Sequence, residues 1–574
     1  MNTIDPEGER PNGCLLNAWG ITMPTHHVNL DALIVREDLE VNSSNPDRPG
    51  GDVPPISLIE LQRGRSMFDV LRKPDFQRET SEWSPQQIVE LVKNILDEEL
   101  IPAVIVWKAP NRDVFVIDGA HRLSALIAWV NDDYGNGVIS QKFYGGADAI
   151  PQAQHTSAKA TRDLIDSQVG SFSKLEQFRT VGGGTPEEMR RAKSLATAYV
   201  VVQSVRNDAS HAEASFYRIN QGGATIDEVE REIIHSRRRP QALAARALLR
   251  AGTGHKYWWP FPDDKKAEIE RLANSLHSTL YRPDLSDKFR TLDMPMAGGG
   301  YSADALSVLF DFIHIANELH RSDPKTAKAK KPKTDPLPKS DPLRDIDGSD
   351  TIKFLKKAKD IAELITSGDD GSLGLHPAVY CYSATGKFQP TAFFAQVKFV
   401  QYLVKHAAKN KFSFARCQFE EFLVEHKYFV NQLSKNLGGT TRAMTRLFEL
   451  YVLVFEQIQA GTDNPTIRKI VLETTPFSQF LKEISKPGEK ISGQEFGRQT
   501  KDAIKLKAEL TNAPRCGICH ARYHPNSTSI DHRDDKKQGG LGSMDNGSVT
   551  HPYCNTGFKN WCQHNGKPLP PSPF

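Results

Sequence analysis

The chain has 574 residues, enough for about three or four domains with separate hydrophobic cores. Lys and Arg number 73 against 70 Asp and Glu, so the formal net charge of +3 excludes a protein whose whole surface is strongly basic. Seven cysteines show no disulfide framework and no apolar run approaches membrane-spanning length, so the composition predicts a soluble cytoplasmic protein without a membrane partner.

Changes in composition along the chain predict four parts. Residues 1–50 are rich in Pro, Asn and Asp and predict an irregular arm, whereas residues 51–250 mix strand and helix patterns. Residues 251–505 are mostly helical in pattern, with a basic Lys/Pro-rich segment over 322–350 that predicts a flexible loop, either solubilising or in contact with DNA backbone. Residues 506–574 form the last part. The predicted fold class is therefore α+β multidomain.

The first clear helix follows Ser84, a candidate N-cap, with Pro85 at the first helical position. Apolar residues at helical spacing continue to Leu96. Two short apolar runs, 101–107 and 114–117, then predict buried strands.

The second of these runs leads into a candidate anion site, Asp118 to Arg122. Free backbone N–H groups at a helix start, together with the positive end of the helix dipole, bind anions. Gly119 would let a phosphate approach the backbone, while His121 and Arg122 would add charge-assisted donors. The alternative is a purely structural helix start, in which these polar side chains form a cap and a surface ion pair.

Three separated blocks of polar and glycine residues lie between 51 and 250. They contain Gln77, Arg78 and Trp83; Asp118, Gly119 and Arg122; and Phe216, Asn220, Gly222, Gly223 and Glu230. The blocks resemble the DGQQR-motif family of GmrSD-type and SspE-type restriction proteins, which have a ParB/sulfiredoxin-like fold.

That resemblance implies a sensing domain that binds a nucleoside triphosphate. The residues it implicates are Gln77, Arg78, Asp118, Gly119, His121, Arg122, Asn220, Gly222 and Gly223. Ala120-His121 replaces the glutamine pair of the family motif, and the gap between Arg78 and Trp83 is one residue longer. We therefore expect nucleotide binding rather than hydrolysis, although an NTPase activity stays open.

Helical patterns dominate 251–505. The main ones cover 301–320, 392–407, 414–433 and 441–459. The apolar stripe of the last, which includes Leu447, Tyr451 and Phe455, is typical of a packed core rather than a cofactor site. We expect this part to be a spacer or a docking scaffold.

Four candidate metal ligands form two pairs near the end of the chain. Cys516 and Cys519 form the first pair and His551 and Cys554 the second, each with two residues between its members. Such a gap places two side chains on one knuckle turn, and two knuckles close a tetrahedral zinc site. The spacing predicts a structural zinc ion, and a zinc ribbon that only binds nucleic acid or protein would have the same ligands.

Asp531-His532, Asn546 and Asn555 lie between and beside these pairs. The order CxxC, DH, glycine pair, Asn, ligand pair and Asn resembles the HNH (ββα-metal) nucleases with a zinc-stapled core, although a second Cys pair is commoner there than His-x-x-Cys. The resemblance implies cleavage of DNA with His532 as general base. It further implies Asp531 and Asn555 as ligands of a catalytic Mg²⁺ or Mn²⁺, and Asn546 as the support of the turn that orients His532.

Together the resemblances imply a prokaryotic restriction or anti-phage endonuclease, a nickase or a double-strand cutter, regulated by nucleotide and by DNA modification. Its partners would be foreign DNA, a nucleoside triphosphate and either a second copy of the chain or other defence proteins. Two alternatives stay open. One is a ParB-like DNA-binding regulator with a non-catalytic zinc module, and the other is a repair or homing-type HNH nuclease.

Overall fold

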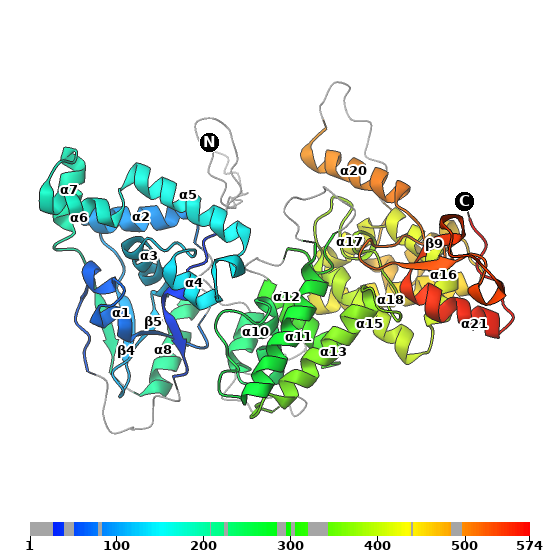
Figure 1. Ribbon diagram of the computed structural model, residues 1–574, viewed down its shortest axis with the longest axis horizontal. Helices are drawn as coiled ribbons and strands as arrows, with labels where there is room; N and C mark the ends of the chain where they lie inside the picture. The colour runs from blue at the N-terminus through cyan, green and yellow to red at the C-terminus, as the bar shows by residue number, and fades with distance from the viewer. Residues whose placement is uncertain are drawn as a thin grey trace, which may run out of the picture. The chain divides into compact units, whose positions relative to one another are not determined.

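The computed structural model describes residues 27–39, 51–77, 83–206, 208–222, 228–283, 294–299, 305–319, 343–437, 440–483 and 496–573. The chain divides into two compact units, Met1–Asp227 and Glu228–Phe574. The first combines a sheet with helices, and the second is mostly helical (Figure 1). Most of the arm predicted over 1–50 and of the segment over 322–350 lies outside the described residues, and the four-part division stays a prediction.

The first unit is built on a mixed five-stranded sheet with the strand order β1-β3-β5-β4-β7. Neighbouring strands are parallel except for the antiparallel pair of β4 and β5. The strands are β1 (Val35–Glu37), β3 (Leu71–Pro74), β4 (Val104–Lys108), β5 (Val114–Asp118) and β7 (Val202–Val205), and a separate antiparallel pair joins β2 (Ile56–Ser57) to β6 (Tyr199–Val200). The two apolar runs predicted as buried strands are β4 and β5 in the interior of this sheet.

Helices pack against the sheet, α3 on β4 and α8 on β5. The helices of this unit are α1 (Ser66–Val70), α2 (Pro85–Leu96), α3 (Ala120–Asn131), α4 (Val138–Tyr144), α5 (Gln152–Gln168), α6 (Phe172–Val181), α7 (Pro186–Ser194) and α8 (Ala209–Gly222). The predicted start of α2 is confirmed. Ser84 accepts a hydrogen bond from the Gln87 amide, the Gln87 side chain accepts one from the Ser84 amide, and Pro85 opens the helix.

The second unit packs its helices around one large apolar core. The helices before the C-terminal segment are α9 (Glu228–His235), α10 (Pro240–Leu249), α11 (Asp263–Tyr281), α12 (Ala305–Ala316), α13 (Ser349–Ile365), α14 (Pro377–Tyr380), α15 (Pro390–Lys405), α16 (Lys409–Glu425), α17 (Tyr428–Leu437), α18 (Thr440–Gln459) and α19 (Asn464–Glu473). The stripe of α18, including Leu447, Tyr451 and Phe455, is buried in that core. Its interpretation as core is confirmed.

The single helix predicted over 414–433 is wrong, because the chain breaks there into α16 and α17. The break falls at His426 and Lys427. The Lys427 ammonium is buried and donates to the carbonyl oxygens of Ala378 at 2.6 Å, Val379 at 2.8 Å and Tyr382 at 2.9 Å. These carbonyls lie at the end of α14, where a cation is favoured. A distant contact therefore ends the helix that the local pattern would have continued.

The C-terminal segment contains α20 (Arg498–Asn512), then the antiparallel strands β8 (Ser529–His532) and β9 (Gly547–Thr550), the π-helical turn η8 (Cys554–Phe558) and α21 (Lys559–His564). The segment is not an isolated module, because η8 packs against α16. Phe414 of α16 contacts Phe558 at a ring-centroid distance of 4.8 Å. The helical part of the unit thus supplies the base on which these last residues fold.

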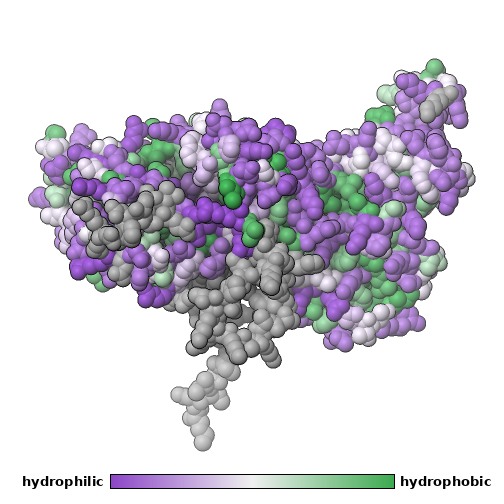
Figure 2. Space-filling model, turned by 90° about the horizontal axis from the view of Figure 1, so that it is seen from below, coloured by the Kyte–Doolittle hydropathy of each residue, from purple (hydrophilic) through white to green (hydrophobic). Residues whose placement is uncertain are grey.

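On the face in Figure 2, hydrophilic residues cover most of the surface and apolar residues form scattered patches. Scattered apolar residues of this kind are ordinary on protein surfaces. Among the residues that the structure describes, no helix is both long and apolar enough to cross a bilayer.

Candidate metal centre and active site

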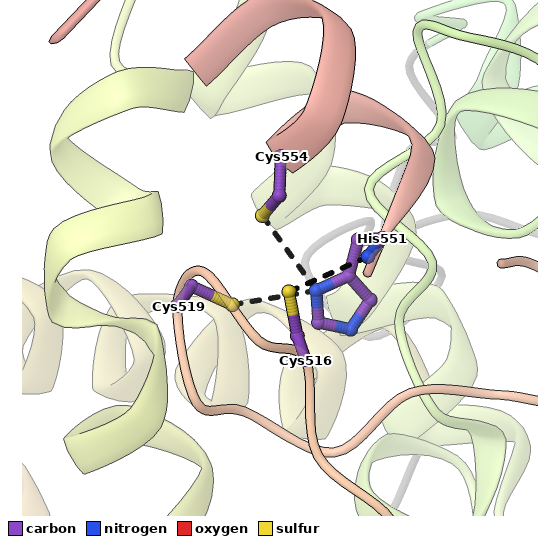
Figure 3. Close-up of side chains that lie close together, drawn as sticks. All are labelled: Cys516, Cys519, His551 and Cys554. Carbon is purple, nitrogen blue, oxygen red and sulfur yellow. Dashed lines mark hydrogen bonds between the residues drawn. The ribbon is translucent and has the colours of Figure 1, made fainter. Parts of the chain in front are cut away.

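The four predicted zinc ligands come together. The ligand atoms of Cys516, Cys519, His551 and Cys554 all lie within 4.8 Å of one another, and all four residues are buried. Figure 3 shows the first two cysteines on one loop and Cys554 on the helical turn opposite, with the imidazole of His551 facing the sulfur atoms. Three thiols and an imidazole at this spacing form a ligand set of the type that binds zinc tetrahedrally.

Backbone contacts shape the Cys516–Cys519 knuckle. The amides of Ile518 and His551 each lie 3.4 Å from the Cys516 sulfur and donate to it. The Gly517 amide donates to the Val549 carbonyl at 3.0 Å, which ties the knuckle to β9. A Cβ atom at position 517 would lie 2.0 Å from the Ser548 hydroxyl, so any larger residue there would force Ser548 to move.

The orientation of His551 is fixed from outside the ligand group. Its Nε2 atom lies 3.0 Å from the Arg522 carbonyl oxygen, so the ring donates there and leaves Nδ1 free of a proton. Nδ1 faces the sulfur atoms of Cys519 at 3.3 Å and Cys554 at 3.7 Å. This tautomer presents a lone pair to a metal.

Burial affects the protonation of the Cys519 thiol. Burial, with the neighbouring Cys516 thiol, raises the pKa of Cys519 well above its ordinary value. A buried thiol of this kind keeps its proton unless a metal ion stabilises the thiolate. The residues present therefore fit a zinc ion, and without one the cluster would bury polar groups at a cost.

A buried ion pair on α16 lies next to this centre, and sequence reasoning missed it. The Arg416 guanidinium donates to the Glu420 carboxylate at 2.7 Å and to the carbonyl oxygens of Leu373 and Gly374. Burial lowers the pKa of Arg416, but Glu420 and the Cys519 and Cys554 thiols outweigh burial and raise it above its ordinary value. The guanidinium thus lies where it can balance the negative charge of three thiolates on one zinc ion.

Glu420 links the ion pair to the ligand group. Its second oxygen accepts from the Arg522 amide at 3.2 Å, and the Arg522 carbonyl in turn accepts from His551. The signal that could have revealed the pair is an arginine and a glutamate four residues apart within an apolar helical pattern.

Gly374 lies against the ligand His551, at a backbone φ of +60°. A Cβ atom there would lie 2.9 Å from His551 Cδ2 and 3.0 Å from the Ser527 carbonyl. We expect Gly374→Ala to destabilise the zinc-loaded protein by about 1–3 kcal/mol and to speed zinc release to a chelator. Gly371→Ala is the matched control, because its Cβ atom would meet nothing within 4 Å. Equal melting temperatures for the two variants would contradict this.

The candidate catalytic residues lie on the β8–β9 hairpin and the turn that follows. Asp531 pairs with Ser548 and His532 with Gly547 in the antiparallel register. Asp531 is buried and His532 is half-buried. Within the described part of the chain the His532 ring forms no hydrogen bond, so its nitrogen atoms are available to a water molecule or a substrate.

Asn546 closes the loop between the two strands. Its side-chain oxygen accepts from the Asp534 amide at 2.7 Å, and its side-chain nitrogen donates to the carbonyls of Asp534 at 3.2 Å and Leu541 at 2.8 Å. The Arg533 amide, directly after His532, donates to the Asn546 carbonyl at 2.8 Å. These contacts are compatible with the supporting role expected of Asn546, which stays a prediction.

Asn555 lies beside the same strand. Its amide nitrogen donates to the Ser529 hydroxyl at 2.8 Å and to the Ile530 carbonyl at 3.2 Å. The side-chain nitrogen of Asn555 is therefore held by β8. Asp531 thus lies on β8, and Asn555 contacts the same strand from η8.

Lys559, the first residue of α21, was not predicted as part of this site. Its ammonium lies 2.8 Å from both carboxylate oxygens of Asp531 and 2.7 Å from the His532 carbonyl oxygen. Three oxygen atoms thus converge on one positive charge. The signal in the sequence is a lysine one helical turn after Asn555.

The three blocks of the first unit meet around the start of α3. Gln77 donates to the carbonyls of Val116 and Ile117 at 3.0 and 3.2 Å, directly before Asp118. Trp83 stacks on His121 at a centroid distance of 6.1 Å, and Phe76 contacts Phe216 of α8 at 5.1 Å. Segments far apart in the sequence thus converge on one helix start.

Arg122 and Gly119 are also engaged by the fold itself. The Arg122 guanidinium lies 3.0 Å from the Asp118 carboxylate and 3.2 Å from the Ala103 carbonyl. Gly119 has φ +95°, and a Cβ atom there would lie 2.9 Å from Val104. The alternative interpretation, a purely structural helix start with a surface ion pair, predicts the same contacts. Arg78, Gly223 and the side chain of Asn220 lie outside the described residues, and Gly222 is the last residue of α8, so the nucleotide site stays a prediction.

A comparison with known protein families supports the resemblance stated for the N-terminal part of the chain. Residues 58–236 match the family described as the GmrSD restriction endonuclease, N-terminal domain. No curated protein and no solved structure matches the chain. The match supports the GmrSD-type resemblance of the first part of the chain, and residues 506–574 lie beyond the matched range.

Proposed function

We propose that this protein is a metal-dependent DNA endonuclease of a prokaryotic restriction or anti-phage system, with an HNH nuclease at its C-terminal end. The observation that carries the proposal is the Asp531-His532 strand, held beside a buried four-ligand metal centre in a chain whose front matches a restriction-endonuclease domain. A strand pair followed by a helix, with zinc ligands at its base, supports the ββα-metal assignment.

The roles of the residues follow from their positions. The half-buried His532 ring accepts a proton from the attacking water, whose oxygen bonds to phosphorus as the sugar oxygen leaves. Asp531 and the Asn555 side-chain oxygen would hold Mg²⁺ or Mn²⁺. When bound, such a cation supplies charge stabilisation for the scissile phosphate and the leaving oxygen. Asn546 holds the loop that follows His532, and the zinc centre fixes the base of the hairpin.

The test is a cleavage panel with the zinc-loaded full chain. Supercoiled plasmid, with and without base modifications, is incubated with Mg²⁺, Mn²⁺ or a chelator, and with or without each nucleoside triphosphate. We expect nicking or linearisation that needs the added cation. Intact DNA under all conditions would contradict the proposal.

A DNA-binding regulator with a non-catalytic zinc module is the second candidate. The observation in its favour is the Asp531–Lys559 ion pair, because a carboxylate already neutralised by an ammonium needs no metal ion. Such a regulator would retard DNA in a gel and leave it uncut with both cations. The same panel therefore separates the two candidates.

We further propose that the first unit binds a nucleoside triphosphate at the start of α3 and regulates cutting. A nucleotide changes the rate only if it binds the active and resting states unequally. Arg122→Ala removes a charge-assisted donor, so nucleotide affinity is expected to fall about ten- to a hundredfold. Metal-dependent nicking of plain DNA should persist and no longer respond to nucleotide.

Calorimetry with ATP and GTP measures the affinity, with Arg179→Ala on α6 as the matched control. Within the part of the chain that the structure describes, Arg179 forms one ion pair, an exposed one with Glu176 at 3.7 Å. Equal affinity in wild type and Arg122→Ala would make Arg122 an ordinary helix-start residue. Loss of basal nicking in a folded Arg122→Ala protein would instead make the first unit part of the cutting apparatus.

A further inference from the structure

The Lys559 ammonium donates hydrogen bonds to both oxygen atoms of the Asp531 carboxylate. All three contacts of its ammonium are short, two to the carboxylate oxygens and one to the His532 carbonyl, and its side chain is 13% exposed. A buried carboxylate needs a counter-charge, and in the absence of a metal ion Lys559 supplies it. The contact therefore places a positive charge directly on the Asp531 carboxylate.

The same contact obstructs a metal ion. Mg²⁺ binds carboxylate oxygens directly at about 2.0–2.1 Å, so it must take a position next to an oxygen that Lys559 already holds. Two cations on one partly buried carboxylate repel each other, and the low local dielectric strengthens the repulsion. Metal binding at Asp531 is therefore weakened as long as the ammonium holds both oxygens.

We propose that Lys559 is a built-in competitor for the divalent cation at Asp531, and that it releases the carboxylate when a DNA phosphate draws the ammonium away. The inference rests on the proposed nuclease function and deepens it. The flexible four-carbon stem lets the ammonium exchange a carboxylate for a phosphate without a change in the backbone. Metal loading is in this way coupled to substrate binding.

The first test measures metal binding rather than activity. Mn²⁺ is titrated into the zinc-loaded full chain without DNA, and free Mn²⁺ is followed by electron paramagnetic resonance. Lys559→Met and Lys559→Gln are expected to bind Mn²⁺ about ten- to a hundredfold more tightly than wild type, because each removes the competing charge. Affinities within twofold of wild type for both variants would overturn the proposal.

Two features of the design keep this result interpretable. Lys567→Met is the matched control, because Lys567 lies over the Trp561 ring at 5.4 Å and its loss changes the net charge equally. Its Mn²⁺ affinity should equal that of wild type. Should Lys559→Met fail to fold, judged by zinc content and melting temperature, Lys559→Gln carries the test, because its amide still offers Asp531 a donor.

The second test adds DNA in a His532→Ala background, so that the duplex stays uncut. Saturating duplex should tighten Mn²⁺ binding when Lys559 is present, and the advantage of Lys559→Gln should shrink to less than about threefold, because the phosphate now holds the ammonium. An advantage of unchanged size with DNA would overturn the release step.

Asp531→Asn separates this inference from the proposed function. If Asp531→Asn loses both Mn²⁺ binding and cutting while the Lys559 variants bind as wild type does, the nuclease stands and the competitor role is overturned. If wild type neither cuts DNA nor binds Mn²⁺ through Asp531, the nuclease function and the competitor role of Lys559 are both contradicted.

Discussion

Replacing Cys516 or Cys554 with serine is expected to release the zinc ion and to unfold the last 60 or so residues. Metal binding at such a site contributes folding free energy on the order of 10 kcal/mol, far more than the segment's small apolar cluster can replace. Elemental analysis measures the zinc, and hydrogen–deuterium exchange measures the loss of protection. We expect protection to fall across β8, β9 and α21 and to stay unchanged in the first unit.

Cys562→Ser is the matched control for the zinc ligands. Cys562 is buried in the same cluster and is not among the four ligands, so its variant should keep one zinc ion. One zinc ion retained in both Cys516→Ser and Cys554→Ser would contradict the ligand assignment.

His532→Ala is expected to reduce DNA cleavage by roughly 10²–10⁴-fold, the usual contribution of a positioned general base. Zinc content and melting temperature should barely change, because the ring is half-buried and within the described part of the chain forms no hydrogen bond. Initial rates of plasmid nicking at saturating Mg²⁺ measure the effect.

The exposed His564 on α21 provides the control, and His564→Ala should cut at the wild-type rate. Full cutting by His532→Ala would contradict the role of His532. Equal losses in both variants would point to damage of the fold rather than to a missing base.

Local chemistry explains what could be predicted from the sequence. The x-x gaps of Cys516/Cys519 and His551/Cys554 determine which side chains share a knuckle, and the structure joins both knuckles in one buried group. Ser84 as a candidate N-cap, with Pro85 directly after it, predicted the start of α2, and two apolar runs predicted the interior strands β4 and β5. In each case the signal lies within a few residues of the feature that it specifies.

Long-range packing explains what the sequence could not reveal. Lys427 ends α16 because carbonyls some 45 to 49 residues away accept its ammonium, so the pattern over 414–433 gave no sign of the break. The partner of Asp531 is Lys559, which lies on a later helix. The charge beside the candidate metal ligands is that of Arg416, which comes from α16 in an earlier part of the unit.

The sequence by itself thus predicted the four candidate metal ligands, the turns that pair them and the GmrSD-type first part of the chain. Only the tertiary structure decided the counter-charges of the buried groups. The physical reason is that spacing records which residues share one turn or strand, whereas a buried charge is stabilised by whichever opposite charge the packed chain brings within hydrogen-bonding distance.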